Sequence, residues 1–153
     1  MDLFRVSGPI ALFLPWPEVH FFEDVSSLRV VPVKTFLSGA SVFDSGGGEW
    51  RVRSTEVEEA SFFSRPQLFG FWSRGWRVVR CEVEPVGPRS VSDLRALLGS
   101  ALRNLGRSYW EDVLGTPLST VENGIASINR SDEVVPLVRD IFRREGEYED
   151  LRN

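Results

Sequence analysis

Two side chains that occur once each in the sequence, His20 and Cys81, could together form a nucleophilic pair. In such a pair the imidazole takes the thiol proton and leaves a reactive thiolate. The pattern around Cys81 favours a different interpretation, because in a strand Cys81 shares one face with Val79 and Val83 while charged residues occupy the other face. A free cysteine in line with valines is typical of a core position. We therefore predict a buried Cys81 and no catalytic residue in the chain.

Metal and cofactor chemistry has few candidate residues. A zinc site needs several His or Cys ligands, and the sequence has one of each. Carboxylates are plentiful, and a pair of them could hydrolyse a glycosidic bond, but most charged clusters are solvated surfaces. We expect no metal and no cofactor.

The acidic run Glu56, Glu58 and Glu59 is a candidate docking patch, since charge complementarity to a basic partner speeds and orients association.

Three successive glycines, Gly46–Gly48, could cradle a phosphate or form a turn. A phosphate loop of the Walker type places Lys and Ser or Thr after its last glycine and then continues as a helix. Here Glu49 follows the glycines and would repel a phosphate, and the next segment alternates like a strand. The sequence therefore predicts a hairpin loop over Asp44–Gly48, in which glycine supplies positive φ angles.

The segment 62–80, FFSRPQLFGFWSRGWRVVR, interleaves large rings with arginines. This combination is typical of surfaces that bind single-stranded nucleic acid, and equally of protein interfaces. It also fits a core covered by the aliphatic stems of the arginines. The net charge of −4 disfavours nucleic acid. Trp72, Arg74 and Arg77 join the acidic run as candidate partner-binding residues.

Strands are predicted in the first part of the chain, where short segments rich in Val, Phe and Trp are punctuated by Pro and Gly. The predicted strands are 3–7, 10–14, 28–33, 40–44, 49–57 and 76–84. After the glycines, period two places Trp50, Val52 and Ser54 on one face and Arg51, Arg53 and Thr55 on the other.

Helices are predicted in the second part. Apolar residues spaced by three and four form a stripe over 91–105, which begins at Val91 after an N-cap at Ser90 and ends at Gly106. A short helical turn follows, then a helix with a capping box at Ser119 and Glu122. Because proline fits only the first turn of a helix, Pro136 places the start of a last helix near Val135.

This order of elements predicts an α+β fold: an N-terminal antiparallel β-sheet followed by C-terminal helices packed on one face. We expect one domain over 1–153, with strands over about 1–86, helices over about 90–145 and a polar tail at 146–153. The leucine stripe should bury itself against the apolar face of the sheet. A hydrophobic share of 42% and a charged share of 26% are ordinary for such a domain.

The N-terminal segment lacks the features of a secretion signal, because it has an acid at Asp2 where a signal has basic residues, and Pro15 closes its apolar run. No run of about 20 apolar residues indicates a membrane span. We expect a cytoplasmic protein without membrane contact.

The arrangement of several segments resembles small bacterial immunity proteins encoded beside polymorphic or contact-dependent toxins. The segments are FLSGASVFDSGGGEWRV at 36–52, WRVVRCEVEPV at 76–86, SVSDLRALLGSAL at 90–102, Trp110, and GIASINRSDEVVPLVRDIF at 124–142. The resemblance implies an α+β, non-enzymatic, cytoplasmic protein that neutralises a cognate toxin by covering it.

Two classes of function stay open at this point. One is a stoichiometric protein-binding module, such as an immunity protein, with a basic toxin domain as its partner. The alternative is a small enzyme or ligand-binding domain that uses carboxylates with Arg74 or Arg77 in a cleft, or a binder of single-stranded nucleic acid through 62–80. A pocket with convergent polar groups would favour a ligand, and an exposed patch would favour a protein partner.

Overall fold

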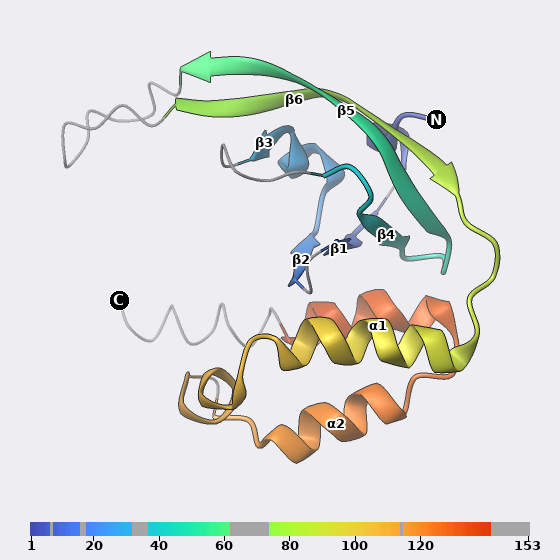
Figure 1. Ribbon diagram of the computed structural model, residues 1–153, viewed down its shortest axis with the longest axis vertical. Coiled ribbons are helices and arrows are strands. Elements are labelled where there is room, and N and C mark those ends of the chain that lie inside the picture. Colours follow the sequence, from blue (N-terminus) through green and yellow to red (C-terminus); the bar gives the residue numbers. More distant parts are fainter. Residues whose placement is uncertain (7, 16–17, 32–36, 62–73, 114, 142–153) are drawn as a thin grey trace.

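The computed structural model describes residues 1–6, 8–15, 18–31, 37–61, 74–113 and 115–141 (Figure 1). The strands are β1 (Ile10–Leu14), β2 (Glu18–Phe22), β3 (Val30–Val31), β4 (Ser41–Asp44), β5 (Glu49–Ser61) and β6 (Arg74–Pro85). The helical elements are η1 (Leu3–Arg5), η2 (Val25–Arg29), α1 (Val91–Arg103), the π-helical η3 (Tyr109–Val113), α2 (Leu118–Ala126) and η4 (Ser131–Glu133), and residues 134–141 form a last helix.

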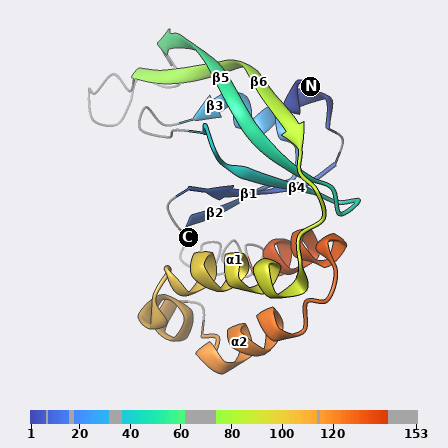
Figure 2. The same cartoon turned by 45° about the vertical axis from the view of Figure 1, so that its right-hand side comes forward.

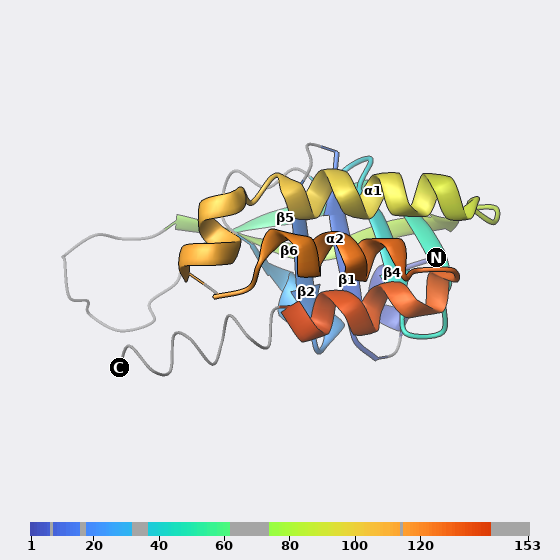
Figure 3. The ribbon, with the colours of Figure 1, turned by 90° about the horizontal axis from the view of Figure 1, so that it is seen from below.

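The strands form one antiparallel sheet in the order β2-β1-β4-β5-β6-β3. Strands come first and helices follow, so the predicted α+β class is confirmed. Helix α1 and the last helix lie beneath the sheet, and α2 lies below them on the side away from the sheet (Figure 1); in the view from below, α2 is drawn in front, between these two helices (Figure 3). The helices therefore pack on one face, as expected.

The sheet curls, and its long strands β5 and β6 lie above β1, β2 and β4 (Figure 2). This curvature creates two cores instead of one. Between the helices and the sheet, Ala11, Phe13 and Phe43 pack with the leucines of α1. Inside the curl, the alternate residues of β1 pack with residues of β4, β5 and β6: Ile10, Leu12, Leu14, Val42, Val52, Val78, Cys81 and Val83. Both faces of β1 are therefore buried, which explains its unbroken apolar sequence.

The glycine loop is the β4–β5 hairpin, as predicted. The Asp44 carboxylate accepts hydrogen bonds from the backbone N–H groups of Gly46 at 2.9 Å and Gly48 at 2.8 Å, and from the indole of Trp50 at 2.9 Å. Gly47 has φ of 87°, a conformation that favours glycine. The glycines therefore serve the turn.

Helix α1 follows the predicted stripe with one change. The Ser90 hydroxyl accepts from the backbone N–H of Asp93 at 3.1 Å, so the N-cap is confirmed. Leu94, Leu98 and Leu102 are buried, whereas Val91 is largely exposed. The buried stripe thus begins one turn later than the spacing predicts.

Some local predictions are wrong, and one strand was missed. Residues 3–5 form a 3₁₀ turn that inserts Leu3 into the second core, where a strand was expected. Strand β2 was not predicted. The capping box is not formed, because α2 begins after Pro117 and the Glu122 carboxylate instead pairs with Arg103 of α1. For Glu122, a contact with the neighbouring helix replaces the local capping interaction.

Two register shifts in the β5–β6 ladder reverse the predicted strand faces. The first lies between Val52 and Ser54 and places Thr55 opposite the buried Cys81, so Thr55 and not Ser54 continues the core face. The second lies between Glu56 and Val57, and because of it Val78 is buried instead of Val79. One extra residue in a strand shifts the alternation by one position, which period two alone does not show.

Candidate functional site

Three of the predicted partner-binding residues meet at one end of the β5–β6 pair. Glu58 lies opposite Arg77 in the ladder, and Glu56 lies opposite Arg80. We call Glu56–Glu58 with Arg77–Arg80 the ribbon end. All of its side chains except that of Val78 are exposed. Here β6 pairs with β3, with Val30 opposite Arg77, whereas β4 pairs with β5 only over Glu49–Arg51.

The other predicted residues are only partly described. Glu59 and Arg74 lie on the same ladder, opposite Trp76 and Ser61, while their side chains lie outside the described atoms. Trp72 falls in 62–73, outside the described residues. Of the aromatic and arginine-rich segment 62–80, the structure thus places the part within β6.

The acidic run of β5 faces arginines of β6, so the ribbon end presents paired charges. Arg80 Nε donates to Glu82 Oε1 at 2.7 Å. This hydrogen bond, followed by the Coulomb attraction of Glu82 and of Glu56, raises the pKa of Arg80 above its usual value. The same bond lowers the pKa of Glu82. A partner at this surface therefore meets alternating charges.

Apolar surface accompanies these charges. Val57 lies opposite the buried Val78, yet Val57 is 46% exposed, as is Val79 at the register shift. Among the residues whose burial is described, Val78 is the second-core residue of β6 nearest to these exposed valines. Exposed apolar side chains bordered by charged ones are the usual composition of a protein interface.

Cys81 and His20, which could in principle have formed a nucleophilic pair, do not pair with each other. Cys81 is fully buried on β6, and His20 lies on β2, which three strands separate from β6 in the sheet order. His20 Nε2 instead lies 3.4 Å from Glu18 Oε1. Burial raises the pKa of the Cys81 thiol from 9.0 to about 11. The interpretation of Cys81 as a core residue is confirmed.

Cys81 should therefore react with a thiol reagent only when the protein unfolds. At pH 8 the buried group is a thiol, and the thiolate is the reactive form. We expect an aromatic disulfide reagent to leave the native protein unmodified over the time in which it labels the denatured chain completely. Rapid labelling without denaturant would contradict the burial of this side chain.

The raised pKa of Cys81 also predicts a pH dependence of stability. The folded protein favours the neutral thiol, because the pKa of Cys81 is higher in the folded state than in the unfolded chain. The contribution of Cys81 to the free energy of unfolding is therefore complete below pH 9 and is lost as the pH rises toward about 11. The free energy of unfolding, measured in urea at several pH values, should fall over this range. Cys81→Ala should show a smaller fall, and an equal fall in both proteins would contradict the prediction.

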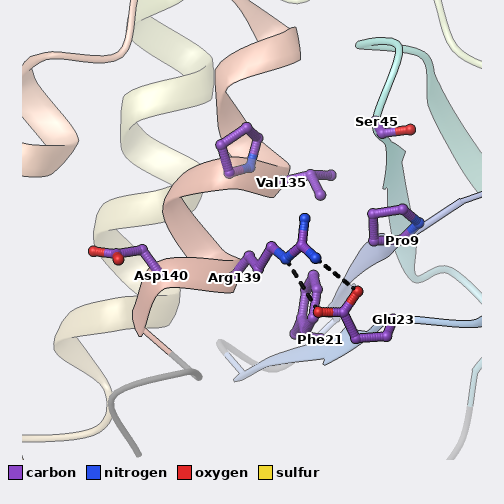
Figure 4. A pocket seen from close by; sticks show the side chains of 8 residues that line it. Pro9, Phe21, Glu23, Ser45, Val135, Arg139 and Asp140 are labelled. Carbon is purple, nitrogen blue, oxygen red and sulfur yellow. Dashed lines mark hydrogen bonds and ion pairs between the residues drawn. The ribbon is translucent and has the colours of Figure 1, made fainter.

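A hollow of about 640 Å³ lies on another part of the molecule, where the start of β1, the end of β2, the β4–β5 turn and the last helix meet. Pro9, Phe21, Glu23, Ser45, Val135, Pro136, Arg139 and Asp140 line it (Figure 4). Arg139 Nε donates to Glu23 Oε1 at 3.1 Å, and Nη2 donates to Oε2 at 3.2 Å. The sequence analysis missed this site, because Glu23 and Arg139 are 116 positions apart and no motif links them.

Within the described ranges, no group of three or more His, Cys, Asp and Glu side chains is arranged to hold a metal ion. Over the same part of the chain, no helix combines the length and the apolar character needed to cross a membrane. Comparisons with protein-family models, curated proteins and solved structures give no match.

Proposed function

We propose that the protein is a non-enzymatic, cytoplasmic protein-binding module that acts as an immunity protein and neutralises a cognate toxin by stoichiometric binding. The observation that carries this proposal is the ribbon end, which combines exposed valines with exposed charged side chains. The resemblance of the sequence to bacterial immunity proteins supports the choice of a toxin as partner.

The geometry of the ribbon end suits a partner with mixed charges. Glu56 and Glu58 offer carboxylates to basic residues, and Arg77 and Arg80 offer guanidinium groups to acidic ones. Alternating charges favour one alignment of two surfaces, because a shifted alignment brings like charges together. Val57 and Val79 supply apolar area that a partner would remove from water.

Co-expression with a toxin domain, sought in the gene next to this one, tests the proposal. The intact chain should restore growth and should elute with the toxin as a one-to-one complex. Reversing two charges with Glu56→Arg and Glu58→Arg should weaken binding about tenfold, which corresponds to about 1.4 kcal/mol. Titration calorimetry would measure the change.

The matched control is Glu111→Arg with Asp112→Arg, because these two exposed acids of η3 undergo the same change of charge in the helical layer. The control should bind as the unchanged protein does. Equal weakening by both double variants would indicate a general effect of net charge and would remove the ribbon end from the proposal. Absence of a complex with the intact chain would reject the function itself.

A further inference from the structure

The hollow beside Arg139 has the size and lining of a ligand site. Its volume of about 640 Å³ lies within the range of about 300–1,000 Å³ found for small-molecule pockets. Phe21, Val135 and the two prolines form apolar walls, and the polar groups Glu23 and Arg139 come from opposite layers of the molecule (Figure 4). Apolar walls with a few fixed polar groups are typical of such sites.

Arg139 retains hydrogen-bonding capacity after its pairing with Glu23. A guanidinium group carries five N–H donors. The two bonds to Glu23 take one donor from Nε and one from Nη2, which leaves three. Nη1 points away from Glu23 in Figure 4, and no described residue accepts a hydrogen bond from it. The open edge of the guanidinium is therefore formed by Nη1 and the second hydrogen of Nη2.

The charges around the hollow select the kind of acceptor that this edge can bind. Glu23 and Asp140 are acidic and Arg139 is basic, so the lining carries one net negative charge. The carboxylate of Asp140 points away from the ion pair (Figure 4). A second carboxylate from a ligand would be repelled by Glu23, and a cation would be repelled by Arg139. A neutral carbonyl oxygen meets neither repulsion and accepts from the open edge.

We propose that this hollow binds a short peptide segment, with a backbone carbonyl on Arg139 and an adjacent apolar side chain against Phe21, Val135 and the two prolines. Glu23 fixes the orientation of the guanidinium and excludes anionic ligands. The Glu23–Arg139 pair is exposed, and exposed pairs contribute little to stability. This site is separate from the ribbon end and does not depend on the function proposed above.

Titration of the isotope-labelled full chain, followed by NMR, tests this site with three probes. N-acetyl-leucine methylamide carries the neutral carbonyl and the apolar side chain, N-acetyl-leucine carries a carboxylate, and N-acetyl-glycine methylamide lacks the side chain. The leucine amide should shift signals of Phe21, Val135 and Arg139 in a saturable manner. The acid and the glycine amide should each bind at least fivefold more weakly.

Arg139→Met should weaken binding of the leucine amide at least fivefold, and Arg139→Lys should also weaken it, because lysine keeps the charge without the planar fork. The matched control is Arg103→Met, since Arg103 forms a similar exposed pair with Glu122 away from the hollow. The control should bind as the unchanged protein does. Glu23→Gln should improve binding of the acid probe and reduce the preference for the amide.

Three results would overturn the proposal. The first is tighter binding of the acid than of the amide by the unchanged protein. The second is a set of shifted signals that lies outside the hollow, or no shift at all. The third is equal affinity of Arg139→Met and the unchanged protein for the leucine amide, once both give the NMR spectrum of a folded chain.

Discussion

Replacing Trp110 by alanine is expected to lower the free energy of unfolding by about 3–5 kcal/mol. Trp110 is 1% exposed and lies in the core between the helices and the sheet. Its indole N–H donates to the Leu102 carbonyl at 3.0 Å, and the ring meets that of Tyr109 edge to face. The substitution removes the ring, leaves a cavity and takes the indole hydrogen bond from the Leu102 carbonyl, which keeps a longer one from the Leu105 N–H at 3.4 Å.

Urea unfolding followed by circular dichroism measures this effect, because the signal does not depend on tryptophan fluorescence. Trp50→Ala serves as the comparison, since Trp50 is only half-buried and its indole donates to Asp44 near the hairpin. Trp50→Ala should cost less than Trp110→Ala. A cost at Trp110 below that at Trp50 would contradict the assignment of Trp110 to the centre of the helical core.

Removing Arg89 should cost about 3 kcal/mol, because it leaves the buried Glu49 without its partner. The side chain of Glu49 is 6% exposed, and Arg89 Nε and Nη2 lie 2.9 Å and 2.7 Å from its Oε1. The pair joins the start of β5 to the segment before α1, so it links the sheet to the helical layer. Arg89→Met should therefore lower the free energy of unfolding measured in urea.

Two further variants identify the cause of this loss. The double variant Glu49→Leu with Arg89→Met should recover most of it, because no unpaired buried charge remains. Arg103→Met, in the exposed pair with Glu122, should cost at most about 1 kcal/mol. If the double variant were as unstable as Arg89→Met alone, the loss would come from packing by Arg89 and not from the charge on Glu49.

Both the local strand propensity and the pairing of β5 with β6 determine where the predicted partner-binding residues lie. Strand propensity alone places Glu56, Glu58 and Arg77 on two successive strands. The register of β5 on β6 makes Glu58 and Arg77 neighbours, and the register shifts expose Val79 beside them. The sequence thus indicated the residue types of the ribbon end, while the pairing of acids with arginines followed from the ladder.

The sequence by itself determined the elements whose stabilising contacts lie within a few residues. The β4–β5 turn is held by Asp44 and its following glycines, α1 is capped by Ser90, and Cys81 alternates with Val83 into the core. These features depend on backbone conformation, hydrogen bonds over two to four positions and side-chain periodicity. Such interactions are visible in a single stretch of chain.

Only the tertiary structure decided the curl of the sheet, the second core and the hollow beside Arg139. The register shifts in β5 and β6 change which side chains face inward, and β2 forms by pairing with β1 despite its weak sequence signal. Glu23 and Arg139 meet because the end of β2 and the last helix approach the same corner of the fold. Contacts between distant segments depend on how the layers pack, and no local pattern records that packing.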